Sequence, residues 1–148
     1  CVAPDVVGVE RARAIAKRLS ADLAIIDKRR SGPGTSEVMN VIGDVRNKIC
    51  VIIDDLVDSG GTIVNAASAL KNKGAKDVYA YVVHGVLTGQ AVKKINNSKI
   101  KKFVISNSIM NFKKIKNSKK FQIISVGTLF AEAIKRISIS KSVSKLFK

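Results

Sequence analysis

Three aspartates and a glycine-rich turn stand close together near the middle of the chain. Asp54 and Asp55 follow the apolar run Ile49–Ile53, and Asp58 begins an Asp-Ser-Gly-Gly-Thr segment that ends at Thr62. Adjacent carboxylates repel each other, and partial burial of one of them is unfavourable unless a partner compensates. Vicinal sugar hydroxyls, which donate hydrogen bonds, would compensate, and so would a Mg²⁺ ion shared with a sugar or a diphosphate.

The segment after the paired aspartates has the composition of an anion-binding loop. Gly60 and Gly61 allow backbone conformations that bring successive N–H groups into one concavity, and Ser59 and Thr62 add hydroxyl donors. Thr62 also opens a predicted helix, whose N-terminal end favours a phosphate dianion. We expect a side chain at Gly60 to crowd that phosphate while the fold survives. The alternative is a plain acidic turn before a helix, which the combined pattern makes the weaker interpretation.

Alternating apolar strands and amphipathic helices must position these residues. The β-branched run Ile49–Ile53 is typical of a strand buried on both faces of a parallel sheet, and the helix Thr62–Lys73 follows, with Gly74 as its stop signal. Ligands of open parallel sheets bind beyond the carboxyl ends of the strands. The other expected strands are Leu23–Ile26, Val38–Ile42, Val78–Val83, Phe103–Ser106 and Gln122–Val126, and the other expected helices are Arg11–Ser20, Gln90–Ile95 and Leu129–Ile137. The alternation predicts an α/β domain with a mostly parallel twisted sheet flanked by helices.

The composition fits one such domain in a reducing compartment. The chain has 148 residues, 46% of them hydrophobic, which is enough for a single core. Cys1 and Cys50 lack a metal-binding spacing, and Cys50 lies in an apolar run like a small buried hydrophobe. No apolar stretch approaches the roughly 18 residues that span a membrane, and no signal peptide is seen. We expect a cytoplasmic protein without membrane contact, and the first residue, Cys1, indicates the later part of a longer protein.

The net charge of +16 lies almost entirely in the second half of the chain. Residues 86–148 hold 15 of the 27 Lys and Arg residues but one of the 11 acidic residues. A basic segment of this kind can bind nucleic acid. However, the lysines alternate with apolar strand and helix positions and lack interleaved aromatic residues. The pattern favours a solvated lysine-rich surface, and we expect no nucleic-acid partner.

Further motifs resemble one enzyme family. The segment Ile52–Thr62 looks like the phosphoribosyl diphosphate-binding motif of the type I phosphoribosyltransferase fold. The motifs that narrow the resemblance to ribose-phosphate diphosphokinase (phosphoribosyl diphosphate synthetase) are residues 3–5 with 11–13, 25–30, 37–45, 74–80, 84–86 and 131–137. The resemblance covers nearly all of residues 1–148. It implies one type I phosphoribosyltransferase-like domain, the C-terminal half of a two-domain enzyme whose N-terminal half is absent from this chain.

The resemblance also implies an activity. Such enzymes transfer the β,γ-diphosphoryl group of ATP to the C1 hydroxyl of ribose 5-phosphate, giving AMP and 5-phosphoribosyl 1-diphosphate, with Mg²⁺ as cofactor. They form homo-oligomers through the full-length protein. Because the other half supplies ATP-binding residues and subunit contacts, we expect this chain to be inactive alone. A phosphoribosyltransferase of nucleobase salvage and a non-catalytic sugar-phosphate-binding remnant stay open as alternatives.

The family motifs assign roles to individual residues. Asp5 is a metal-linked residue, and Asp54 and Asp55 face the ribose hydroxyls. The 5-phosphate is held by Asp58, Ser59, Gly60, Gly61 and Thr62.

A basic loop is the expected catalytic element. Lys28 and Arg30 are the implied catalytic residues, on a flexible loop over Lys28–Glu37 whose positive charge would stabilise phosphoryl oxygens. Two departures from the family pattern accompany this assignment. Val7 precedes Gly8 where the family has a second glycine, so we expect crowding there. The segment 31–36 is also richer in glycine than usual, which raises the entropic cost of closing the loop.

Overall fold

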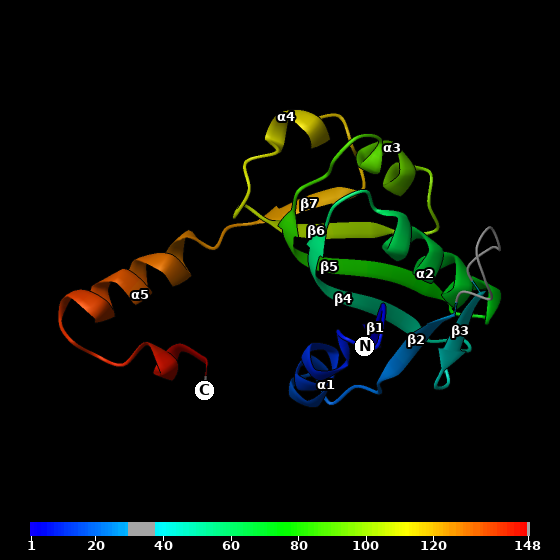
Figure 1. Cartoon of the computed structure of the whole chain (residues 1–148), viewed down its shortest axis with the longest axis horizontal. Coiled ribbons are helices and arrows are strands. Elements are labelled where there is room, and N and C mark those ends of the chain that lie inside the picture. Colours follow the sequence, from blue (N-terminus) through cyan, green and yellow to red (C-terminus); the bar gives the residue numbers. More distant parts are fainter. Residues whose placement is uncertain (30–37, 148) are drawn as a thin grey trace.

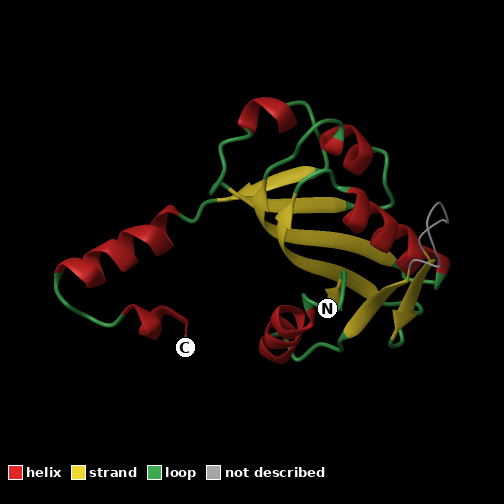
Figure 2. Ribbon diagram, viewed as in Figure 1, coloured by secondary structure: helices red, strands yellow, loops and turns green. Residues whose placement is uncertain are grey.

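One sheet organises the molecule, which a computed structural model describes over residues 1–29 and 38–147, without the side chains of Lys28, Arg29 and Val38. The strand order is β3-β2-β1-β4-β5-β6-β7 (Figures 1 and 2). Every neighbouring pair is parallel except β2 and β3, which confirms the expected mostly parallel sheet. The strands are β1 (Val2–Ala3), β2 (Ala24–Arg29), β3 (Val38–Ile42), β4 (Ile49–Val57), β5 (Asp77–Gly85), β6 (Lys102–Ser106) and β7 (Phe121–Ile124).

Helices cover the two faces of this sheet unequally. The helices are α1 (Val9–Arg18), α2 (Gly61–Asn72), α3 (Ala91–Asn96), α4 (Phe112–Ile115) and α5 (Gly127–Ser138), followed by the 3-10 helix η1 (Val143–Phe147). Residues of α2, α3 and α4 share one core cluster with Ile52, Val78 and Phe103 of the sheet. On the opposite face, Ala12 of α1 packs with Ala3 and Ile53 in a smaller cluster.

The larger core explains why α2 forms where it does. Its apolar stripe is fully buried, and each buried Ile or Leu side chain stabilises the fold by about 1.5–3 kcal/mol; the stripe consists of Ile63, Ala66, Ala67 and Leu70. The predicted stop at Gly74 is confirmed, because its φ of 90° lets the Ala75 N–H donate to the Leu70 carbonyl at 3.0 Å.

The chain changes direction across the sheet between β1 and β4. From β1 the chain proceeds to β2 and β3 on one side, and from β4 it proceeds to β5, β6 and β7 on the other. In open α/β sheets, such a switch point leaves a crevice at the carboxyl ends of the two strands, where ligands bind. Ligand-binding residues are therefore expected directly after β1 and at the end of β4.

Two strands that carry predicted site residues extend beyond their predicted ends. β4 does not end at Ile53 but continues to Val57, because Asp54 pairs with Val82 and Leu56 with His84 of β5. The paired aspartates thus lie in a strand and not in a loop. β2 likewise extends through Arg29 by antiparallel pairing with β3, so Lys28 is a strand residue opposite Met39, and the prediction of a loop beginning at Lys28 was wrong.

The expected burial of β4 on both faces is only partly correct. Cys50 and Ile52 are buried under α2, as predicted, but Ile49 is 60% exposed. The reason is that α1 is the only described helix on that face, and its core cluster reaches Ile53 and Val51.

Helix α5 lies apart from the sheet. Figure 1 shows it beyond the end of β7, and none of its residues is buried. Its apolar side chains, among them Phe130, Ile134 and Ile137, are exposed. A hydrogen bond of 2.8 Å from Arg18 Nη2 to the Phe147 carbonyl ties η1 to α1.

Candidate functional site

One arginine bridges the two paired aspartates at the switch point. Arg11, in the first turn of α1, places Nη1 3.2 Å from Asp54 Oδ1 and Nη2 2.7 Å from Asp55 Oδ2. Because α1 follows β1 directly, its first turn stands over the neighbouring strand β4. The compensating partner that two adjacent carboxylates need is therefore supplied within the chain.

The two carboxylates differ in their electrostatic state. Burial raises the pKa of Asp54 to about 6, and the carboxylates of Asp55 and Asp5 add to the rise. For Asp55, burial acts in the same direction, but the hydrogen bond with Asp54 and the charge of Arg11 outweigh it and lower the pKa. The pair thus combines a carboxyl group that titrates near neutral pH with one that stays ionised.

Asp5 completes this group of acids. Its Oδ1 atom accepts a hydrogen bond of 2.8 Å from the Gly8 N–H, and the charge of Asp5 reaches Asp54. A Cβ atom on Gly8 would lie 3.4 Å from that oxygen, in van der Waals contact with it. The Val7 side chain is 84% exposed, and its expected crowding of this position stays a prediction.

The glycine turn connects β4 to the start of α2. Gly60 has a φ of 76°, a left-handed conformation that glycine adopts readily, and the Val64 N–H makes the first bond of the helix to its carbonyl at 3.1 Å. The N–H groups before Val64 therefore have no partner within the helix. No acidic residue lies in this first turn. The start of α2 is suited to bind an anion.

A side chain at Gly60 would meet the protein as well as a bound phosphate, and the expected crowding of the phosphate stays a prediction. Gly60 is buried, and a Cβ atom there would lie 3.4 Å from Ile95 Cδ1 and 3.7 Å from the Ala91 carbonyl oxygen of α3. Gly61 is the open position, since the nearest atom to its Cβ would be Ser59 Oγ at 3.9 Å. The two glycines have different tasks: Gly60 packs against α3, and Gly61 leaves the start of the helix accessible.

The turn between β5 and α3 is hydrogen-bonded to the residues where the glycine turn begins. The N–H groups of Val86 and Leu87 donate to the Val57 carbonyl at 3.0 and 3.2 Å, and the Thr88 N–H donates to the Asp58 carbonyl at 3.1 Å. Asp58 and Ser59 are exposed, as side chains facing a ligand must be. The structure therefore brings the sugar-binding and phosphate-binding residues predicted from the sequence to one edge of the sheet.

A family model described as the phosphoribosyl synthetase-associated domain matches residues 31–148. The chain belongs to this family. The curated relatives that it matches are named ribose-phosphate pyrophosphokinase. One from Brucella melitensis is 56% identical over 146 residues, or 99% of this chain and 47% of the relative. One from Bradyrhizobium diazoefficiens is 53% identical over 146 residues, or 99% of this chain and 46% of the relative. The chain thus spans less than half the length of these relatives.

Solved structures agree with the family assignment. The phosphoribosylpyrophosphate synthetase of Mycobacterium smegmatis superposes with a TM-score of 0.84 and 31% identity, over 94% of this chain and 44% of that one. The orotate phosphoribosyltransferase of Aeropyrum pernix gives 0.50 and 21%, over 84% and 57% of the two chains. At that identity the second likeness shows the fold alone. It confirms the type I phosphoribosyltransferase-like fold for this synthetase-associated domain.

Two site predictions concern the basic segment. Arg30, the glycine-rich positions 31–36 and the rest of the predicted loop to residue 37 lie outside the described residues. The backbone of Lys28 is described as part of β2, but its side chain is not. The catalytic roles of Lys28 and Arg30 stay predictions.

Arg11 is the functional residue that sequence reasoning missed. The motif containing it supported the family resemblance, but it received no role of its own. A signal was present: two adjacent acids at a strand end need a cation, and Arg11 stands three residues after Gly8 in the first turn of a helix. Contacts over 43 and 44 residues of sequence, however, are fixed only by the strand order.

Mg²⁺, which the family resemblance implies, fits this edge of the sheet only with help from a substrate. Among the described residues, no group of three or more His, Cys, Asp or Glu side chains could hold a metal ion. Magnesium sites in phosphate-handling enzymes commonly use one or two carboxylates, with waters and substrate phosphates completing the shell. Asp5 and Asp54 interact electrostatically and could supply two such carboxylates.

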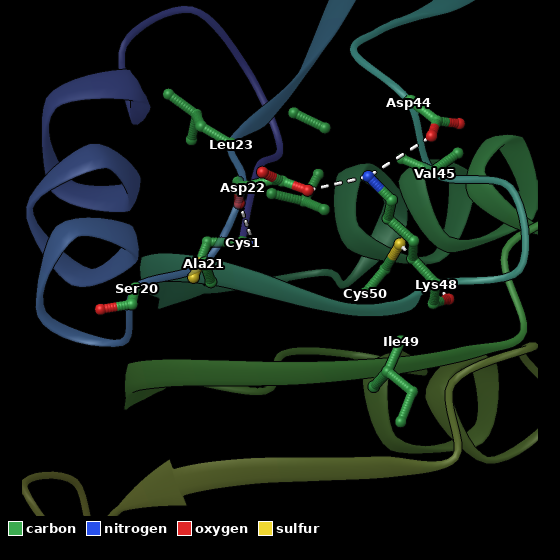
Figure 3. A pocket seen from close by; sticks show the side chains of 12 residues that line it. Cys1, Ser20, Ala21, Asp22, Leu23, Asp44, Val45, Lys48, Ile49 and Cys50 are labelled. Atoms are coloured by element: carbon green, nitrogen blue, oxygen red, sulfur yellow. Dashed lines mark hydrogen bonds and ion pairs between the residues drawn. The ribbon is translucent and has the colours of Figure 1, made fainter.

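A cavity of about 280 Å³ lies at the opposite end of the same strands (Figure 3). It is lined by residues at the amino ends of β1, β2 and β4. Within it, Lys48 Nζ forms ion pairs with Asp22 Oδ2 at 2.8 Å and Asp44 Oδ2 at 3.3 Å. Each of these charged side chains is satisfied by another. This ion-pair group lies apart from the site formed by Asp5, Asp54 and Asp55 and contributes no residue to it.

Neither of the broader partner predictions is overturned. Among the helices of the described residues, none is both long and apolar enough to cross a membrane. The absence of a nucleic-acid partner stays a prediction.

Proposed function

We propose that this chain is the ribose 5-phosphate-binding half of a ribose-phosphate diphosphokinase. The observation that carries the proposal is the arrangement at the switch point. The Arg11-bound pair of Asp54 and Asp55 stands at one end of a short turn, and the acid-free start of α2 stands at the other. Sugar hydroxyls that donate and a phosphate that accepts hydrogen bonds match these two ends in chemical type.

The residues take complementary roles in binding. Asp54 and Asp55 accept hydrogen bonds from the ribose hydroxyls, while Arg11 keeps the two carboxylates in place. The 5-phosphate is received by the backbone N–H groups and hydroxyls of residues 58–62. Asp5 and Asp54 would hold Mg²⁺ together with substrate oxygens, and the chemistry supplied there would be charge neutralisation at the diphosphate. Lys28 and Arg30 add positive charge, which matters most when the phosphoryl oxygens gain charge in the transition state.

The overall reaction transfers the diphosphoryl group of ATP to the C1 hydroxyl of ribose 5-phosphate, releasing AMP. Residues 1–148 form one domain in this proposal and correspond to the C-terminal half of the enzyme. The share of 46–47% of the relatives' length supports this division. The complete enzyme is cytoplasmic and oligomeric, and catalysis requires the ATP-binding half, so the binding of ribose 5-phosphate is the property to test on this chain.

The test is calorimetric titration of ribose 5-phosphate into the chain and two variants. Thr62→Val removes one hydroxyl at the start of α2 and keeps the side-chain shape. Ser68→Ala is the control, because Ser68 Oγ lies further along the same helix and donates to the Val64 carbonyl at 3.1 Å. We expect Thr62→Val to weaken binding about tenfold, the value of one hydrogen bond to a charged group, and Ser68→Ala to leave it unchanged. Equal affinities for all three proteins would contradict the assignment.

A further inference from the structure

Two polar side chains, the N-cap residue of α4 and a lysine within that helix, bind the backbone segment that is hydrogen-bonded to the glycine turn. Asn111 Nδ2 donates to the carbonyl oxygens of Gly85 at 2.5 Å and Val86 at 3.0 Å. Lys114 Nζ donates to the carbonyl oxygens of Val86 at 3.2 Å and Leu87 at 3.0 Å. Three consecutive carbonyl groups are thus bound by two side chains that stand one helical turn apart.

The same stretch of backbone contacts the proposed phosphate-binding turn through its N–H groups. Val86 and Leu87 both donate to the Val57 carbonyl, and Thr88 donates to the Asp58 carbonyl. Residues 85–88 therefore form a layer between α4 on one side and the end of β4 on the other. A shift of this layer would move the acceptors that fix where the glycine turn begins.

Leu87 shows that this layer is under strain. Its φ is 54°, a left-handed value that costs energy for a residue with a Cβ atom, and its side chain is buried. Such conformations persist when the surroundings over-determine them, and they cluster at functional sites. The hydrogen bonds from Asn111 and Lys114 are contacts of that kind, because they bind the Val86 and Leu87 carbonyls, which belong to the two peptide groups that flank Leu87.

We propose that Asn111 and Lys114 are positioning residues for ribose 5-phosphate, acting through residues 85–88 on the phosphate-binding turn. The inference rests on the proposed function and adds a determinant of affinity on the far side of that turn. Asn111 is uncharged, so its effect cannot come from attraction between its own charge and the phosphate. A purely electrostatic role for α4 would instead belong to its lysines alone.

The test is the affinity of the 148-residue chain for ribose 5-phosphate in Asn111→Ala, Lys114→Met and the double variant. We expect each single variant to bind about tenfold more weakly, on the order of the contribution of one hydrogen bond. The double variant should lose less than the product of the two effects, because both side chains share the Val86 carbonyl. Lys113→Met is the matched control: it removes an exposed lysine from the same helix and should leave affinity unchanged.

Thermal unfolding of each variant separates positioning from a general loss of stability. A merely structural role predicts a lower unfolding midpoint with unchanged affinity below it, and that result would overturn the inference. Equal weakening by Lys113→Met and Lys114→Met, with Asn111→Ala unaffected, would overturn it in favour of simple electrostatics. Should Asn111→Ala fail to fold, Lys114→Met decides, since Lys114 is exposed. Wild-type chain that does not bind ribose 5-phosphate would reject the proposed function itself.

Discussion

Arg11 makes it possible for two neighbouring aspartates to lie at one edge of the sheet. Its two terminal nitrogens each take one carboxylate, at 3.2 and 2.7 Å, and the Asp54 side chain is only 16% exposed. A buried carboxylate that loses its cation is strongly destabilised or becomes protonated. The ionisation of the paired aspartates in β4 therefore depends on an arginine of a different element, α1.

Removal of that cation should raise the pKa of Asp54. In Arg11→Met, we expect the Asp54 carboxyl group to titrate above its present value of about 6, because the positive charge 3.2 Å from Asp54 Oδ1, which favours the ionised form, is then lost. Titration of the side-chain carboxyl carbons by NMR measures this pKa directly. Arg13→Met, which removes an exposed arginine from the same helix, serves as the control and should leave it in place.

The raised pKa of Asp54 also predicts how stability depends on pH. The folded state holds the proton more tightly than the unfolded state, whose pKa is 3.8, so ionisation between pH 3.8 and about 6 lowers the free energy of unfolding. The full effect of such a difference is about 3 kcal/mol, and the lowered pKa of Asp55 acts in the opposite direction. Urea denaturation at pH 4 and pH 7 should show that Asp54→Asn gains stability relative to wild type on going to pH 7. A constant difference between the two proteins would refute this electrostatic account.

The two glycines of the turn should respond oppositely to the same substitution. Gly60→Ala should lower the free energy of unfolding by about 1–3 kcal/mol, because alanine is strained at a φ of 76°. Gly61→Ala should leave stability nearly unchanged, since nothing lies closer than 3.9 Å to the new Cβ, but should weaken ribose 5-phosphate binding. Chemical denaturation and calorimetric titration of both variants test the pair. Stability loss in Gly61→Ala alone would reverse the assignment.

At the scale of elements, the sequence predicted what local pattern and burial determine. The sequence predicted the apolar stripe of α2, the end of that helix at Gly74 and the parallel arrangement of the central strands. The length of β4 was not predicted, because the pairing of Asp54–Val57 depends on β5 rather than on local propensity. The short elements β1 and α4 lack enough residues for a periodic pattern. Their positions follow from strand order, which no local signal encodes.

Helix α5 was predicted from its periodicity, yet its apolar face is not used within the described residues. Ile134 is 64% exposed, whereas Ile63 of α2 is 2% exposed. We therefore expect Ile134→Ala to change the free energy of unfolding by less than about 0.5 kcal/mol. The same change at Ile63 should cost about 2–5 kcal/mol. Chemical denaturation compares the two, and a large loss in Ile134→Ala would show that α5 packs in a way the structure does not describe.

At the scale of the whole molecule, one fold brings together residues that the sequence keeps far apart. The paired aspartates and the glycine turn were predictable because they occupy one continuous motif. The Arg11 bridge and the layer of residues 85–88 were not, because both depend on which strands become neighbours. Acids at the switch point of the sheet and an anion-binding helix start nearby are the features that match a phosphorylated sugar.

The most direct test of that claim is differential scanning calorimetry of the chain with ribose 5-phosphate and with ribose. A ligand that binds only the folded state raises the unfolding temperature, and at equal concentration the ligand with the higher affinity raises it more. If residues 58–62 hold the 5-phosphate, ribose 5-phosphate will raise the unfolding temperature, and ribose at the same concentration will raise it much less. Equal shifts with the two compounds, or no shift with ribose 5-phosphate, would contradict the account.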